Sequence, residues 1–203
     1  MITVDSQQRN PRVQPTVSDA DLQRAADSLL AATNPELPEN KYFTEFARDK
    51  LRWMVRESAA GRLTVAFVID TAGGDLPPEV MMAATRLDGQ PTIFIAKPRF
   101  ARFLSEGGRT TPPFSQQQKN DFSVALIHET VHLLGWAGPP PTREQRAQEE
   151  SRAWRDVTLG VVRPWRAANQ PLHHRLIQVD DAFLSCDDAI PCPAIALLVR
   201  LTQ

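Results

Sequence analysis

The segment that most constrains the fold is residues 115–135, which has the length of a long helix and is apolar on nearly all sides. It begins at Ser115, a residue type typical of helix N-caps, and it ends at Gly135. The apolar positions occupy the whole circumference of the predicted helix: Phe122, Val124, Ala125, Leu126, Ile127, Val131, Leu133 and Leu134. Because a helix that is apolar all round is a buried one, the rest of the chain must enclose it.

Three ionisable residues interrupt this buried helix, His128, Glu129 and His132, in the pattern His-Glu-x-x-His. Residues four apart lie on one face of a helix, so the two imidazoles are able to point at one Zn²⁺ ion. Glu129 then lies beside the ion, where it can take a proton from water. The alternative is a pair of core histidines bonded to backbone carbonyls, with Glu129 in a salt bridge. Chance gives this pattern in roughly four of a thousand chains of this composition, so we favour the metal site.

A catalytic zinc site normally takes three protein ligands, and the third must lie outside this helix. The position used by histidine-rich versions of the motif is Gly138, which has no side chain, so the candidates are Glu144, Glu149 and Glu150. A helix is predicted from Thr142 to about Leu159, and its apolar stripe includes Ala147, Glu150, Trp154 and Val157. Since an inward-facing carboxylate needs a partner, we predict Glu150 as the ligand, with Glu149 as the alternative.

These residues resemble the gluzincin group of zincin metallopeptidases. The similarity rests on His128-Glu129-Thr130-Val131-His132 and, eighteen residues further on, on Glu150-Ser151-Arg152-Ala153. It implies one Zn²⁺ per chain held by His128, His132 and Glu150, with Glu129 as the catalytic base. It also implies a sheet whose edge strand, here Thr92 to Ala96, binds an extended peptide by strand addition.

The chain departs from some members of this group at Trp154, where they carry an aspartate that orients the first histidine. Asp121 and Asp156 are candidates for that orienting role, and the alternative is that both are solvated surface charges. His173 or His174 is a candidate donor to the oxyanion that forms during hydrolysis. Two exposed loop histidines are the alternative for this pair.

The other segments predict an α+β fold of zincin type, in which a small mixed sheet packs against the buried active-site helix and flanking helices. Helices are expected over residues 18–32, 40–58 and 98–106. A strand is expected over 63–70, followed by a hairpin of 80–87 and 91–97 with its turn at 88–90. Residues 194–201 are expected to complete the core as a strand or helix.

The chain has 203 residues, which suits one domain over 18–203 preceded by an extended polar lead-in at 1–17. A net charge of −1 gives no support to nucleic-acid binding, and no apolar run reaches the ~18–20 residues of a membrane span. No signal peptide is visible in the first 17 residues. Cys186 and Cys192 are the only cysteines, and both a disulfide, compatible with secretion, and two free thiols remain open.

The sequence therefore predicts a zinc metallopeptidase that acts on a peptide or protein substrate through a water activated by the metal, with Glu129 as general base. One alternative is a non-catalytic zinc-stabilised binding or regulatory protein, against which Glu129 argues because a structural site needs no base. The other is a zinc hydrolase of a non-peptide amide. An open cleft along the edge strand favours a peptide, whereas a closed pit favours a small molecule.

Overall fold

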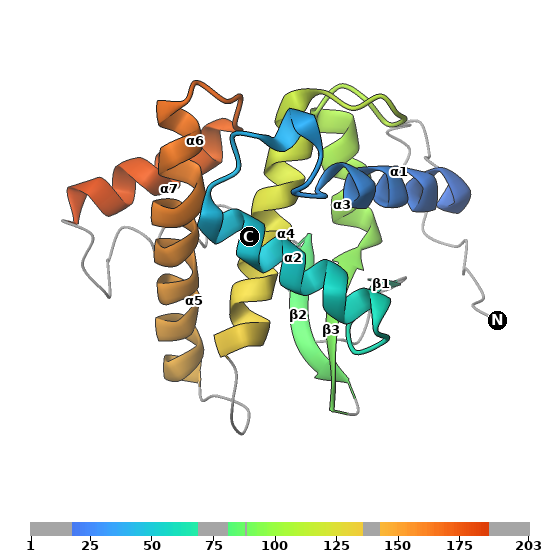
Figure 1. The fold of residues 1–203 in the computed structure, drawn as a ribbon, viewed down its shortest axis with the longest axis horizontal. Helices are drawn as coiled ribbons and strands as arrows, with labels where there is room; N and C mark the ends of the chain where they lie inside the picture. Colours follow the sequence, from blue (N-terminus) through green and yellow to red (C-terminus); the bar gives the residue numbers. More distant parts are fainter. Residues whose placement is uncertain (1–17, 69–80, 88, 136–142, 187–203) are drawn as a thin grey trace, which may run out of the picture.

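In the computed structural model of the protein, residues 18–68, 81–87, 89–135 and 143–186 are described. They form an α+β fold that is mostly helical, with one small three-stranded mixed sheet (Figure 1). This confirms the predicted fold class at that level. The expected lead-in at 1–17, the expected cap at Thr142 and the expected element at 194–201 lie outside the described residues.

Two amphipathic helices open the fold. Helix α1 (Asp19–Ala32) begins as predicted, because the hydroxyl of Ser18 accepts the N–H of Asp21 at 3.2 Å. After the 3₁₀ turn η1 (Pro38–Asn40), helix α2 (Glu45–Ala59) begins later than the predicted residue 40. The reason is local, since the Thr44 hydroxyl accepts the N–H of Ala47 at 3.2 Å and so starts the helix there.

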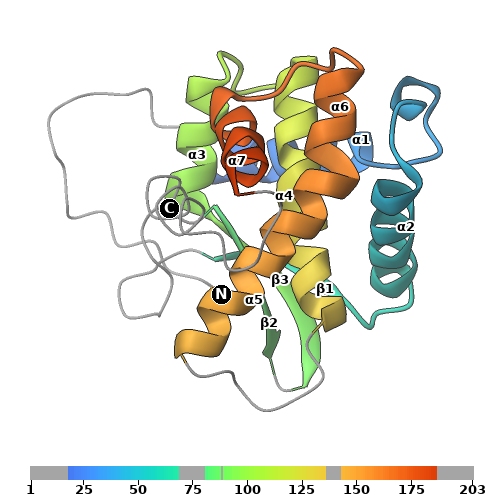
Figure 2. The same cartoon turned by 90° about the vertical axis from the view of Figure 1, so that its left-hand side faces the viewer.

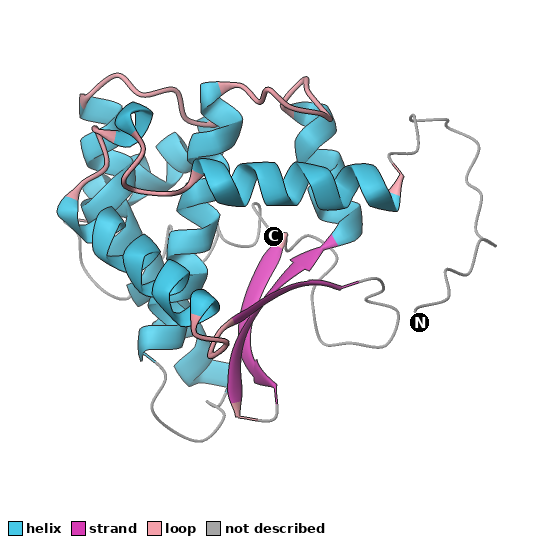
Figure 3. Ribbon diagram, turned by 45° about the vertical axis from the view of Figure 1, so that its right-hand side comes forward, coloured by secondary structure: helices cyan, strands magenta, loops and turns pink. Residues whose placement is uncertain are grey.

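The sheet contains β1 (Thr64–Val68), β2 (Met82–Leu87) and β3 (Gln90–Ala96) in the order β1-β3-β2. Strands β2 and β3 form the predicted antiparallel hairpin, and β1 pairs with β3 in parallel, which makes the sheet mixed (Figure 3). The prediction that Thr92 to Ala96 forms the edge was wrong, because β1 covers the other side of β3. Among the described residues, the edge strand that lies beside α4 is β2, which has no strand paired on its outer side.

The sheet leads through α3 (Lys97–Glu106) into the central helix α4 (Gln116–Gly135). Ser115 caps α4 in a reciprocal pair with Gln118: its hydroxyl accepts the N–H of Gln118, and its own N–H donates to the Gln118 side chain, both at 3.2 Å. As the apolar pattern requires, α4 contacts α1, α2, α5 and β2. In Figure 1 it passes through the middle of the molecule, with α5 on one side and the sheet on the other.

The α-helical part of α5 (Arg143–Val157) ends close to the predicted residue 159, but the chain does not leave the helical conformation there. It continues through a π-helical turn, η2 (Thr158–Val162), into α6 (Arg163–Ala167). Gly160 lies in this turn, where a Cβ would meet the Phe46 ring at 2.5 Å, so the missing side chain lets α2 dock against the turn.

The last helix of the described residues, α7 (His174–Ser185), covers a segment for which no helix or strand was predicted. Cys186, directly after it, is disulfide-bonded, and Cys192, the other cysteine of the chain, lies outside the described residues. No helix in the part of the chain that the structure describes is long and apolar enough to cross a membrane.

Candidate metal centre

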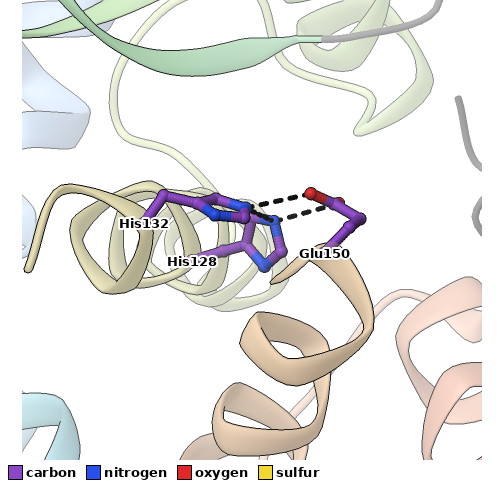
Figure 4. Close-up of side chains that lie close together, drawn as sticks. All are labelled: His128, His132 and Glu150. Atoms are coloured by element: carbon purple, nitrogen blue, oxygen red, sulfur yellow. Dashed lines mark hydrogen bonds and ion pairs between the residues drawn. The ribbon is translucent and has the colours of Figure 1, made fainter. Parts of the chain in front are cut away.

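Two neighbouring helices bring three predicted ligands together. Helix α4 supplies His128 and His132 from successive turns of one face, and α5 supplies Glu150 from its inward side. Figure 4 shows both rings turned toward the Glu150 carboxylate. His128 is buried, whereas His132 and Glu150 are half-buried. Of the alternatives to Glu150, Glu149 is exposed, and the Glu144 side chain lies outside the described residues.

The donor atoms of these residues converge. The Nε2 atoms of the two histidines lie 3.1 Å apart. Nε2 of His128 lies 3.2 Å from Oε1 of Glu150, and Nε2 of His132 lies 2.9 Å from Oε2. Three corners of a tetrahedron around Zn²⁺, with metal–donor distances of about 2.0–2.1 Å, are about 3.3 Å apart. The two histidine nitrogens therefore have nearly the spacing of zinc ligands, and each faces a different oxygen of Glu150. One donor atom from each of the three residues lies within 4.8 Å of the others, so the group could hold a metal ion.

The charges in the cluster support one another. Burial alone would raise the pKa of the Glu150 carboxyl, but the two histidines outweigh it and hold that pKa well below its ordinary value. Burial alone would lower the pKa of His132, but its hydrogen bond to Glu150 and the nearby carboxylates raise it above its ordinary value. Glu150 is thus a negatively charged oxygen donor facing two imidazoles, which is a donor set that suits Zn²⁺.

Glu129 lies beside this cluster without belonging to it. Its side chain is buried, and burial raises the pKa of its carboxyl above the ordinary value. Its Oε2 accepts the backbone N–H of Ala84 in β2 at 2.7 Å. The N–H of Ala96 donates to the carbonyl of Met81, and pairing alternates along an antiparallel ladder, so Ala84 opposite Ile93 turns its N–H away from β3. The open edge of the sheet therefore meets the acidic residue of the motif.

A cavity of about 270 Å³ adjoins the cluster and is lined by residues from β2, α3, α4, α5 and α7. Figure 2 shows how the ribbons of these elements are arranged. His128, Glu129 and Glu150 line one end. Apolar side chains make up much of the wall, including Met82, Phe103, Val124, Ala125, Leu176 and Val179. The combination gives a largely apolar recess that opens onto two acidic side chains and a histidine.

Asp121 and His173 lie in the wall of this cavity, away from the ligands. The Asp121 carboxylate accepts the backbone N–H of His173 at 3.0 Å, and burial raises the pKa of Asp121 to about 7. His173 is the N-cap of α7, where its ring nitrogen accepts the N–H of Arg175. Burial, with the neighbouring His174 and Arg175, lowers the pKa of the His173 ring. His174 is exposed and does not line the cavity, so only His173 of this pair stays a candidate donor to a substrate.

The expected orienting carboxylate is not present at His128. Its Nδ1 atom is buried and has no hydrogen-bonding partner among the described residues, so neither of the two candidates, Asp121 and Asp156, holds this ring. A side chain that does contact the cluster is that of Trp154, one helical turn after Glu150. The sequence places Trp154 in the same apolar stripe as Glu150, at the position of an absent aspartate, but no contact with the ligands was predicted, although residues four apart on a helix lie side by side.

Comparisons of the chain with models of protein families, with curated proteins and with solved structures found no significant match.

Proposed function

We propose that the protein is a zinc-dependent metallopeptidase with a gluzincin-like ligand set. The observation that carries this proposal is the convergence of His128, His132 and Glu150 at one end of a cavity that also contains the buried carboxylate of Glu129. Two imidazoles and one carboxylate leave a position open on a four-coordinate zinc ion, which is the arrangement of catalytic rather than structural sites.

The chemistry assigned to these residues is hydrolysis of an amide. A zinc ion held by the three ligands would polarise the substrate carbonyl and lower the pKa of water. Glu129 accepts a proton from the water that attacks the carbonyl carbon and passes it to the departing nitrogen. The carbon–nitrogen bond then breaks, and the products are a carboxylate and an amine. No side chain is acylated in this scheme.

The open edge of β2 supports a peptide as the substrate. An extended peptide adds to a strand edge through main-chain hydrogen bonds, and alternate side chains enter neighbouring pockets. Met81 and Met82 at the start of β2 line the cavity, and Ala84 reaches Glu129. A peptide along this edge would therefore pass the carboxylate and place a side chain in the apolar recess.

The first test is the metal content of the purified protein by elemental mass spectrometry, after dialysis against trace zinc. We expect about one zinc per chain, because the donors already have ligand spacing. Less than one tenth of an equivalent, with no uptake from added zinc, would overturn the metal centre.

The second test is cleavage of a defined peptide mixture, followed by mass spectrometry. We expect cleavage by the zinc-loaded protein, a loss of at least a hundredfold in Glu129→Gln, and full activity in the exposed control Glu149→Gln. Zinc binding without cleavage of any peptide would overturn the peptidase. A set of small amides tested in parallel then separates a hydrolase of non-peptide amides from a non-catalytic zinc protein.

A further inference from the structure

Trp154 contacts two of the three candidate ligands. Its indole N–H donates to Oε1 of Glu150 at 3.1 Å, across one turn of α5. Its ring packs on the ring of His128, which belongs to α4, with centroids 4.4 Å apart and planes 34° apart. The side chain is half-buried and lines the cavity. One side chain thus links the two helices that supply the cluster.

The hydrogen bond distinguishes the two oxygens of Glu150. Oε1 accepts the indole N–H and lies 3.2 Å from Nε2 of His128, while Oε2 lies 2.9 Å from Nε2 of His132 and has no contact with the indole N–H. An indole N–H only donates and does not titrate in the working pH range, so it neither binds a metal ion nor takes the proton of the carboxyl. Its effect on Glu150 is therefore to fix the rotation of the carboxylate.

The ring contact acts on His128. Nδ1 of this histidine has no hydrogen-bonding partner in the described parts of the chain, although histidine ligands are usually oriented by a bond from that second nitrogen. Against one side of the His128 ring lies the indole, and His132 packs edge-on at 4.7 Å. Packing by Trp154 thus takes the place of an orienting hydrogen bond.

We propose that Trp154 is a positioning residue of the metal centre: its N–H holds Oε1 of Glu150, which leaves Oε2 to the metal, and its ring holds the imidazole of His128. This inference rests on the metal centre of the proposed function and is independent of whether the protein cleaves peptides. Where some gluzincins carry an aspartate that orients the first histidine, this chain thus carries a tryptophan that contacts both that histidine and the carboxylate.

Two variants separate the parts played by the ring and the N–H. Trp154→Phe keeps an aromatic ring beside His128 and removes the donor, whereas Trp154→Leu removes both. Trp53→Phe is the matched control, because Trp53 is half-buried on α2 and does not line the cavity. The zinc dissociation constant is measured by competition with a chromophoric chelator, and the melting temperature of the metal-free protein is recorded beside it.

We expect zinc affinity to fall about tenfold in Trp154→Phe and further in Trp154→Leu, within the 10–100-fold range of residues that orient ligands. The control stays within twofold of the unmodified protein. A purely structural role would lower the melting temperature of metal-free Trp154→Phe without changing its affinity for zinc. Unchanged affinity in both Trp154 variants would overturn the proposal.

A measurement on the unmodified, zinc-loaded protein covers the case in which the variants do not fold. Hydrogen exchange of the indole protons is followed by ¹⁵N NMR with ¹⁵N-labelled tryptophan, and Trp53→Phe assigns the comparison resonance. We expect the Trp154 proton to exchange at least tenfold more slowly than that of Trp53, because it is held by Glu150. Equal exchange rates would contradict the hydrogen bond on which the proposal depends.

Discussion

The protein buries carboxylates in two regions and treats them in opposite ways. Between α6 and α7, Asp180 is 1% exposed and is paired with Arg163 at 2.8 Å and with Arg166 at 3.0 Å. In the cavity beside α4, Glu129 accepts a backbone N–H, Asp121 accepts a backbone N–H and a hydrogen bond from the Gln117 side chain, and Glu150 faces two histidines and an indole. Arginines line other parts of the same cavity, namely Arg99, Arg102 and Arg175.

The difference identifies which region is a site. A buried charge that belongs to the fold is normally compensated by opposite charge, as at Asp180, because desolvation is costly. Carboxylates that line a cavity and have no ion-pair partner of their own are able to bind a cation from solution, such as a metal ion. Each prediction below changes one member of this comparison.

The largest effect is expected from Glu150→Gln, which removes the only negative ligand of the cluster. The affinity for zinc should fall on the order of a thousandfold, about 4 kcal/mol, because an amide oxygen replaces a carboxylate. Chelator competition measures the loss, and Glu149→Gln is the control on the exposed neighbour. Equal zinc affinity in Glu150→Gln and the unmodified protein would exclude Glu150 as a ligand.

Asp180→Asn removes the buried charge that pairs with Arg163 and Arg166. It should destabilise the fold without changing the metal centre. Removal of one partner of a buried pair costs about 3–5 kcal/mol when a charge stays buried. Arg163 and Arg166 are 29% and 40% exposed, so water can solvate them and we expect about 2–3 kcal/mol. Urea denaturation measures it, with the exposed Asp181→Asn as control; a loss of zinc affinity would contradict the division into two regions.

The candidate ligands of the site were predictable because their signals are local. The spacing of His128 and His132 fixes one helical face, and the apolar stripe of the next helix selects Glu150 over Glu149. The caps at Ser18 and Ser115 also follow from residues within one turn. Such interactions join residues at most four positions apart.

The surroundings of the site were not predictable, because they depend on segments that meet only in the folded chain. The hairpin signal contains β2 and β3 but does not say on which side β1 pairs, so the edge strand was assigned wrongly. The N–H of Ala84 is a backbone group and has no residue-type signal. The close approach of Phe46 to Gly160 in the turn between α5 and α6 joins residues far apart in the chain.

Asp121→Asn tests whether a cavity carboxylate without a cationic partner makes the stability of the fold depend on pH. The folded-state pKa of Asp121 is about 7 against an ordinary value of 3.8, so between about pH 4 and 7 the folded chain binds more protons here than the unfolded chain. Stability from this group is therefore lost as pH rises through that window, by at most about 1.4 kcal/mol per pH unit.

The asparagine does not titrate, and its side-chain oxygen is able to accept the same N–H of His173. The stability of the variant relative to the unmodified protein should thus increase as pH rises, by about 3 kcal/mol between pH 4.5 and 8. Urea denaturation of both proteins across this range gives the difference, in which all other titrating groups cancel. Parallel stability profiles would show that Asp121 is an ordinary solvated acid.

The smallest effect is expected from Glu106→Gln, at the rim of the same cavity. Glu106 is ion-paired with Arg102 at 2.6 Å, but both side chains are about half exposed, and such pairs contribute about 0.2–1 kcal/mol. Glu106 is also the last residue of α3, where the helix dipole disfavours a negative charge, so the two effects oppose each other. We expect a change below about 0.5 kcal/mol in urea denaturation at low salt. A loss of 2 kcal/mol or more would mean that solvent exposure does not determine how much an ion-paired carboxylate contributes to the free energy of unfolding. The difference between Asp180 and the cavity carboxylates would then need another explanation.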